Sequence, residues 1–346
     1  MVVGCKARYQ PLVTVSGAIT ATADDLRTGF YPNQPKLAPA IVGGATFGRL
    51  WKTNLPLSTG EQVFAQPLFT GGAVFVATLA NNIYSLDGDT GAVRASRALG
   101  TPWRTSDIGC GDVTPTVGIA GTPVIDDAAN VAYFLSKTYL GDAPVSDTTN
   151  SAWFLHAVDV LTLAEQTNFP VRIQGVADND QAVRFDPFYQ MQRTGLLLMN
   201  GVVYAGFGSH CDYGQYEGWV IGVGTDGVIK SLFATETGPG AGRGAGIWQA
   251  GGGLVSDGPG RIFFTTGNHI GAPNMTPAAQ PTAVLGQSVV RLDVRNDATL
   301  VASDYFSPAD RQMLDAADVD LGSGAPVALP AVPFSTTAAP NLMIAG

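Results

Sequence analysis

The stretch that decides the fold is Ile83-Tyr84-Ser85-Leu86-Asp87-Gly88-Asp89-Thr90-Gly91. Its first half is a short apolar run with an aromatic residue, which is typical of a β-strand. Its second half consists of turn formers, because Asp can accept hydrogen bonds from the backbone of a turn and Gly can take a positive φ. A strand that ends in aspartate recurs at Leu155–Asp159 and Val289–Asp293. We interpret this strand as part of a repeated unit.

Two other kinds of strand recur along the chain. The first has a proline near its start, where the missing N–H costs no ladder hydrogen bond; its copies are Gln66-Pro67-Leu68, Thr122-Pro123-Val124 and Ala325-Pro326-Val327. The second carries an aromatic residue at its centre, as a strand packed on both faces requires. Its copies are Ala73–Ala77, Val131–Leu135, Val202–Gly206 and Arg261–Thr265.

Three such strands, a turn and a fourth edge strand make up one blade of a β-propeller. The predicted fold class is therefore all-β, a β-propeller of four-stranded antiparallel blades. Residues 1–22 are assigned to an N-terminal tail and residues 23–346 to the propeller. Blades are expected at roughly 62–100, 117–175, 193–236 and 245–306, with a partial blade at 322–346. Leu50–Leu55 is predicted as a lone strand that completes the last blade.

The composition narrows the class of partner. The net charge is −9 and no cluster of Lys and Arg occurs, which excludes a nucleic-acid-binding surface. No apolar stretch has the length of a membrane span. Met1-Val2-Val3-Gly4-Cys5 looks like the end of a bacterial lipobox. Two interpretations stay open for it, a lipid anchor at Cys5 and an ordinary chain terminus.

Tyr84–Gly91 resembles the pyrroloquinoline-quinone (PQQ)-type repeat, although Ser85 replaces its Ala and no Trp follows the turn. From Ala23 onward the chain resembles bacterial extracytoplasmic PQQ-like (quinoprotein-like) propellers, a group that includes an outer-membrane assembly lipoprotein. The segments that carry this resemblance are Val63–Leu68, Gly118–Asp126, Gly195–Leu198 and Gly246–Gln249. Members of the group normally have seven or eight blades. The resemblance thus implies an extracytoplasmic location and an incomplete ring of that size, with a compact five-bladed ring as the alternative.

The quinoprotein dehydrogenases of this superfamily hold PQQ near the propeller axis, between a tryptophan and a disulfide of two adjacent cysteines. A calcium ion and an aspartate base complete their site. The resemblance would give Trp248 the stacking role and make Asp112 the base or a calcium ligand. The cysteines here stand at positions 5, 110 and 211, so the adjacent pair is absent. Packing of Trp248 between blades is the alternative.

Cys110 and Cys211 lie in polar, glycine-containing loops of blades that should be neighbours. In an oxidising compartment they would pair as a disulfide, and the alternative is two separate buried thiols. His210, Cys211 and Asp212, with Glu217 shortly after, are also of metal-ligand types, and calcium would suit them better than zinc. No CxxC or HxxxH motif accompanies them. A polar loop held by hydrogen bonds is therefore the default, and no metal is assigned.

Three further candidates for a binding rim are Gln192, Arg193 and His269, which lie at strand ends. Turn-stabilising or solvent-facing roles are the alternative for each. His156, inside a strand, is expected to be a structural histidine. We expect Asp112, His210, Asp212 and Trp248 to lie on one loop-bearing face.

Two functions compete on this basis, and a hydrolase whose carboxylates from different blades meet at the propeller axis is a minor third alternative. The first is an extracytoplasmic binding or scaffold propeller for a protein, a glycan or a small ligand, with no cofactor and no covalent chemistry. The alternative is a PQQ- and calcium-dependent quinoprotein oxidoreductase that acts on alcohols or sugars. The missing cysteine pair favours the first, and the superfamily resemblance alone supports the second.

Overall fold

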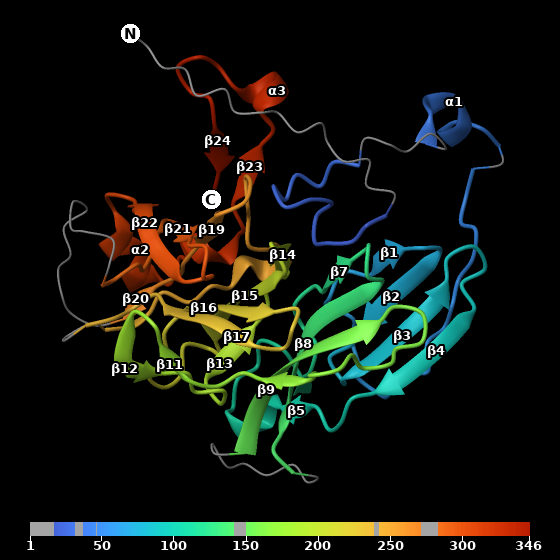
Figure 1. Cartoon of the computed structure of the whole chain (residues 1–346), viewed down its shortest axis with the longest axis horizontal. Coiled ribbons are helices and arrows are strands. Elements are labelled where there is room, and N and C mark those ends of the chain that lie inside the picture. Colours follow the sequence, from blue (N-terminus) through green and yellow to red (C-terminus); the bar gives the residue numbers. More distant parts are fainter. Residues whose placement is uncertain (1–16, 32–36, 46, 142–149, 239–241, 271–282) are drawn as a thin grey trace.

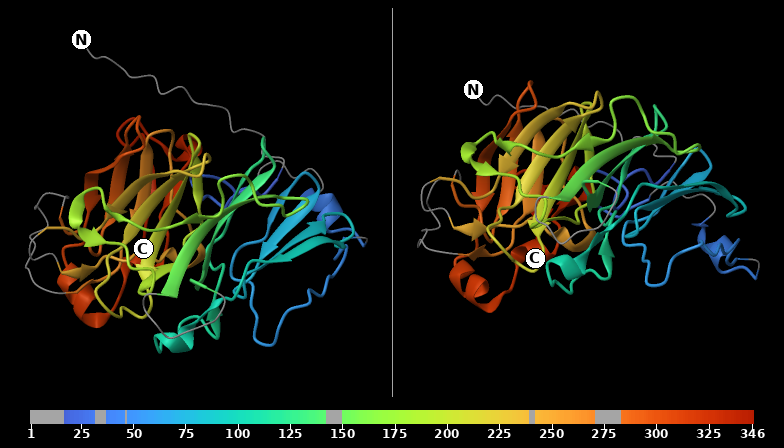
Figure 2. Two further views of the ribbon diagram at one scale, coloured as in Figure 1. Left: turned by 60° about the horizontal axis from the view of Figure 1, so that its bottom comes forward. Right: turned by 90° about the horizontal axis from the view of Figure 1, so that it is seen from below.

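The structure is a computed structural model that describes residues 17–31, 37–45, 47–141, 150–238, 242–270 and 283–346. Antiparallel sheets follow one another along the chain and stand side by side, from β1–β4 at one end to β19, β21 and β22 at the other (Figure 1). Figure 2 shows the same succession of sheets from two other directions. The predicted all-β propeller fold is confirmed.

The first sheet is four-stranded, and its strands lie in the order of the chain. They are β1 (Leu68–Thr70), β2 (Ala73–Ala77), β3 (Asn82–Asp87) and β4 (Val93–Ala98). In the turn after β3 the Asp87 carboxylate accepts hydrogen bonds from the backbone N–H groups of Asp89 and Thr90, and Gly91 has a φ of 72°. The aspartate that ends the strand therefore also holds the turn, as the sequence predicts.

The second sheet is built around one long hairpin. Its strands are β7 (Val124–Asp126), β8 (Val131–Tyr139), β9 (Ser151–Asp159) and β10 (Val171–Arg172). β8 and β9 pair along their whole length, with Val131 opposite Asp159 and Tyr139 opposite Ser151. Asp159 repeats the turn seen after β3, because its carboxylate accepts the backbone N–H groups of Leu161 and Thr162.

The third sheet has a first strand that is broken in two. Its strands are β13 (Gln190–Gln192), β14 (Leu197–Met199), β15 (Val202–Ser209), β16 (Trp219–Gly224) and β17 (Ile229–Ala234). β13 pairs with the C-terminal part of β15 and β14 with its N-terminal part. The break places Arg193 between two strand segments instead of inside a ladder.

The fourth sheet has three strands, β19 (Arg261–Thr265), β21 (Val289–Val294) and β22 (Leu300–Phe306). The place of a first strand is taken by an isolated bridge between Val255 and Phe263. Two further strands, β23 (Val327–Leu329) and β24 (Leu342–Ile344), form a hairpin of their own.

The remaining elements are short. Paired strands lie in the loops; they are β5 (Trp103–Arg104) with β6 (Thr116–Val117), β11 (Val176–Ala177) with β12 (Asp180–Arg184), and β18 (Arg243–Gly244) with β20 (His269–Ile270). The helices are α1 (Pro39–Val42), α2 (Arg311–Ala317) and α3 (Ala331–Phe334), with 3-10 turns at Thr105–Asp107, Gln249–Gly251 and Leu321–Ser323. Among the residues that the structure describes, no helix is long and apolar enough to cross a membrane.

The aromatic residues at the strand centres pack between neighbouring sheets. Phe75 and Phe134 meet between the first and second sheets, with ring centroids 5.6 Å apart. Trp153 and Phe207 meet edge to face between the second and third sheets, also at 5.6 Å. Because neighbouring sheets pack on one another through these rings, the core is a series of apolar layers between blades.

A segment before the first sheet crosses the starts of the sheets in turn. It bonds to each of them through the pairs Ala18–Phe69, Ile19–Ile125, Arg27–Leu196, Arg27–Leu254 and Leu26–Ala328. In Figure 1 it is the dark-blue trace between β1, β7, β14 and β23. Residue 22, the predicted end of the tail, lies within this segment, and Cys5 lies outside the described residues.

The prediction of a strand at Leu50–Leu55 is wrong. This stretch has no regular secondary structure. The Trp51 indole donates a hydrogen bond of 3.0 Å to the carbonyl of Gly88, and the Thr53 hydroxyl donates to the carbonyl of Gly91. The stretch is therefore held against the β3–β4 turn of the first sheet by these two bonds, and it pairs with no strand of the described residues.

Candidate functional site

Four of the seven predicted binding residues line one cavity of about 180 Å³. They are Asp112, Arg193, His210 and Trp248. Asp112 lies in the loop between β5 and β6, Arg193 in the break between β13 and β14, His210 directly after β15, and Trp248 after β18. Loops of several sheets thus meet at this point, and the expected common face holds for Asp112, His210 and Trp248. Their role in binding stays a prediction.

Cys110 and Cys211 form the predicted disulfide, with their Cα atoms 5.8 Å apart. It joins the loop of Asp112 to the residue after His210, so it ties two sides of the cavity together. Cys110, Asp112 and Cys211 lie close enough to share an ion, but both sulfurs are in the disulfide and neither is a thiolate. Elsewhere in the described ranges no three His, Cys, Asp or Glu side chains converge in this way.

Arg193 is half-buried and has little to bond to. Its Nη1 donates one long hydrogen bond of 3.5 Å to the carbonyl of Ala120, and its guanidinium lies 4.8 Å from the centroid of the Phe64 ring. Within the described part of the chain no carboxylate lies within 4 Å of it. Burial lowers the pKa of Arg193 from its ordinary value.

His210 contributes a ring to the cavity wall, with its polar atoms in use elsewhere. Its Nε2 is 2.7 Å from the Nζ of Lys137, and its ring packs on Trp103 at a centroid distance of 4.9 Å. Burial, and next the Lys137 ammonium, hold the pKa of His210 well below its ordinary value, against a hydrogen bond with the backbone of Gln190. With both nitrogens engaged, His210 shapes the cavity and is not a free donor or acceptor for a ligand.

Trp248 is half-buried, and two glycines make room for its indole. A Cβ at Gly208 would lie 3.0 Å from the ring carbons, and one at Gly246 would lie 3.0 Å from the ring nitrogen. The indole therefore lies flat on the backbone of β15 while part of it borders the cavity. An aromatic face beside an opening can pack against an apolar ligand.

Gln192 and Asp212, two of the other predicted residues, serve the surrounding framework. Gln192 is buried, and its Nε2 donates to the carbonyl of Thr194. Asp212 accepts hydrogen bonds from the hydroxyls of Ser209 and Tyr216. Neither lines the cavity, so their side chains act as the turn-stabilising groups of the alternative interpretation.

His269, the seventh, belongs to a separate buried acidic group. Its Nδ1 is 3.3 Å from a carboxylate oxygen of Glu236, and this carboxylate raises the pKa of His269. Burial and then the charge of Glu236 raise the pKa of Glu217 to about 7. Glu217 thus faces Glu236, and the predicted ligand types His210, Cys211, Asp212 and Glu217 do not converge on one point.

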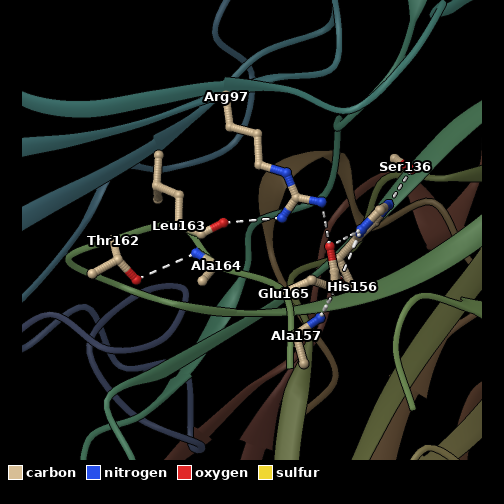
Figure 3. Close-up of polar contacts among 8 residues, drawn as sticks. All are labelled: Arg97, Ser136, His156, Ala157, Thr162, Leu163, Ala164 and Glu165. Atoms are coloured by element: carbon tan, nitrogen blue, oxygen red, sulfur yellow. Dashed lines mark hydrogen bonds and ion pairs between the residues drawn. The ribbon is translucent and has the colours of Figure 1, made fainter. Parts of the chain in front are cut away.

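A polar cluster that the sequence did not reveal joins the first and second sheets (Figure 3). The Oγ of Ser136 is 3.0 Å from Nε2 of His156, whose Nδ1 is 3.1 Å from a carboxylate oxygen of Glu165. Arg97, at the end of the first sheet, approaches the same carboxylate at 2.9 Å. The order serine, histidine, carboxylate is that of a catalytic triad.

Burial assigns this cluster a structural role. Ser136 and His156 are only 2% and 5% exposed, and the ring of Phe134 stacks on the imidazole at 5.1 Å. A substrate carbonyl cannot approach the Ser136 hydroxyl in this conformation. His156 is therefore the structural histidine that its place in a strand predicts. The sequence could predict only that Ser136 and His156 lie near each other on paired strands. The ion pair between Arg97 and Glu165 joins two sheets and depends on the tertiary fold.

No family model and no curated protein matches this sequence. Solved structures do match it. A quinohemoprotein alcohol dehydrogenase from Pseudomonas putida is 16% identical over 76% of this chain and 36% of its own, with a TM-score of 0.49. The quinohemoprotein alcohol dehydrogenase from Comamonas testosteroni is 17% identical over 78% and 38%, also with a TM-score of 0.49. BamB from Moraxella catarrhalis is 15% identical over 75% and 68%, with a TM-score of 0.36.

This chain spans little more than a third of the length of the two dehydrogenases. At these identities the likeness concerns the fold alone. The function has to be argued from the site.

Proposed function

We propose that this chain is an extracytoplasmic binding propeller and that a small ligand occupies the cavity bordered by Arg193 and Trp248. One observation supports the proposal: four residues that the sequence predicts as ligand-binding lie in separate loops and line a single cavity. Concave sites with apolar walls and a few polar groups are the usual sites for small molecules. A cavity of this size suits a small molecule better than the broad surface of a protein or a glycan chain.

A location outside the cytoplasm is supported by the disulfide between Cys110 and Cys211. Structural disulfides persist in oxidising compartments and are rare in the cytosol. The same bond supports the binding function, because it holds the Asp112 loop against the end of β15.

The alternative function, oxidation of alcohols or sugars with PQQ and calcium, fits the site poorly. Calcium takes six to eight oxygen ligands. The described residues around the cavity offer one carboxylate, that of Asp112. Trp248 and Asp112 match two parts of such a site, but the residues present do not make a calcium site. Binding without covalent chemistry is therefore the function we propose.

A thermal-unfolding screen of small metabolites tests the proposal. A ligand of the cavity raises the midpoint of the wild-type protein, since binding to the folded state alone adds about 2.7 kcal/mol at one hundred times the Kd. Trp248→Ala should abolish that shift. Trp51→Ala removes an indole from the β3–β4 turn instead and should leave the shift intact. Ligands whose effect survives Trp248→Ala, or the absence of any ligand, would count against the cavity.

Calorimetric titration with PQQ, with and without calcium, decides between the two functions. We expect no calcium-dependent binding. Tight calcium-dependent binding that Asp112→Asn abolishes would establish the oxidoreductase and refute the proposal.

A further inference from the structure

Arg193 is the one Lys or Arg among the described residues that line the cavity, and the bonding of its guanidinium is incomplete. Arg27 shows how this fold satisfies a buried arginine: its nitrogens donate to the carbonyls of Leu254, Leu196 and Ala21 at 2.9 Å each, and to the hydroxyl of Thr20. Arg193 has a single contact of 3.5 Å instead. Other arginines without a described partner, such as Arg184, are exposed to solvent. Arg193 is shielded from solvent in part and faces a cavity, so an acceptor for its N–H groups is missing.

Two of the other polar residues around the cavity, Ser209 and His210, are already engaged. The Ser209 hydroxyl donates to Asp212 and accepts from its N–H. The nitrogens of His210 bond to Lys137 and to the backbone of Gln190. A ligand would therefore find one free cation, one exposed carboxylate and otherwise apolar walls, among them Phe64, Val113, Met191 and Trp248. This lining does not suit a glycan, whose many hydroxyls would each need a partner.

The size of the cavity limits the ligand to about one ring. An engineered apolar cavity of about 150 Å³ holds a benzene molecule. The present cavity of about 180 Å³ has room for such a ring with a small substituent.

We propose that the cavity binds a small monocarboxylate with an apolar body of about one ring, its carboxylate on Arg193 and its body against Trp248. This inference rests on the proposed function and names the ligand class. A carboxylate matches the fork of a guanidinium with two parallel charge-assisted hydrogen bonds. A single anion suffices, because the described lining holds no second unpaired cation.

Benzoate and benzamide are the probes, since they have nearly the same shape and differ in charge. Each is titrated by calorimetry into the full chain at low ionic strength. We expect benzoate to bind about tenfold more tightly than benzamide, a difference of about 1.4 kcal/mol, because its carboxylate accepts charge-assisted hydrogen bonds from the guanidinium. Arg193→Gln should remove this preference, and Arg193→Lys should keep part of it, because the charge remains and the fork is lost. Arg184→Gln, an exposed arginine, is the matched control and should change nothing.

The outcomes separate the inference from the proposed function. Loss of the benzoate preference in Arg193→Gln but not in Arg184→Gln supports both. If the two probes bind equally and Trp248→Leu weakens both, the cavity is a binding site but the carboxylate inference is wrong. If neither probe binds the folded wild-type protein at millimolar concentration, the inference is wrong, and the metabolite screen alone decides the proposed function. Added salt should weaken benzoate and leave benzamide unchanged.

Discussion

At the scale of the residue, a buried polar group that has its hydrogen-bond partners stabilises the fold, and one that lacks them is a candidate for ligand binding. Lys137 is the clearest example, because it is fully buried in β8 and forms no ion pair with a carboxylate of the described residues. Its Nζ lies 3.0 Å from the carbonyl of Phe188, 3.1 Å from that of Gln190 and 3.8 Å from the centroid of the Trp103 ring. Burial lowers its pKa well below the ordinary value. Lys137 thus holds His210 in place in the cavity wall, whereas Arg193 faces into the cavity.

The Glu165 cluster gives a prediction at the same scale. Glu165→Gln keeps the shape of the side chain but removes the charge that Arg97 and His156 share. Because hydrogen bonds to charged groups contribute more than neutral ones, we expect a loss of about 2 kcal/mol in the free energy of unfolding at pH 7. Ser136→Ala removes one neutral bond and should cost about 1 kcal/mol. Urea unfolding of the wild type and both variants measures these losses.

The cost of Glu165→Gln should depend on pH. Burial alone would raise the pKa of Glu165, but hydrogen bonds and charges from His156 and Arg97 hold it below its ordinary value. A carboxylate with a depressed pKa stabilises the fold above its unfolded pKa, and this contribution is lost as the pH falls through the folded value. The difference between wild type and Glu165→Gln should therefore shrink below about pH 4.5. A difference that stays constant down to pH 3 would contradict the assigned ionic contacts.

At the scale of the element, the sequence predicts those features that depend on residues close together in the chain. The strand Ala73–Ala77 and the turn after Asp87 follow from the residues inside them, and both are confirmed. The strand expected at Leu50–Leu55 failed because Trp51 and Thr53 bond to the turn after β3, a distant contact that a local pattern cannot distinguish from sheet pairing.

The candidate site likewise has features that the sequence predicts and features that depend on distant contacts. Cys110 and Cys211 were open to prediction from residue type and blade order, and the disulfide is confirmed. The unpaired state of Arg193 was not, because it depends on the break between β13 and β14. Nor was the engagement of His210, since its partner Lys137 lies in a different sheet.

At this scale the contribution of the disulfide to stability can be tested by mutation. Replacing Cys110 and Cys211 together by serine frees a loop whose ends are 101 residues apart. Closing a loop of that length stabilises a fold by about 2–5 kcal/mol. The free energy of unfolding of the double variant should therefore be lower by that amount, and its unfolding midpoint should fall with it. Ligand affinity at the cavity should fall as well, because the Asp112 loop loses its tie to β15.

The wild type with its disulfide reduced is the matched control, and its midpoint should fall to that of the double variant. The same midpoint for the double variant and the oxidised wild type would show that the bond does not form in solution.

At the scale of the whole molecule, the sheets are held together by apolar layers between them and by one segment that touches them all. The layers act between neighbours only, as in other repeat architectures. The segment around Arg27 adds contacts that skip neighbours, from β1 through β7 and β14 to β23. It should therefore make the unfolding of the sheets more cooperative than neighbour packing alone.

Arg27→Met tests this role. The apolar side chain is similar in length but leaves the carbonyls of Leu254 and Ala21 without donors, and that of Leu196 with only a 3.5 Å contact from the Thr20 hydroxyl. Each unpaired buried acceptor costs about 1–3 kcal/mol, so a total loss of about 3 kcal/mol or more is expected. Hydrogen exchange should show protection falling together in β1, β7, β14 and β19, because the segment joins their sheets. Arg184→Met, on an exposed arginine, should stay within about 0.5 kcal/mol of the wild type. Loss of protection in the fourth sheet alone would mean that Arg27 anchors its nearest strand and that the sheets depend only on their neighbours.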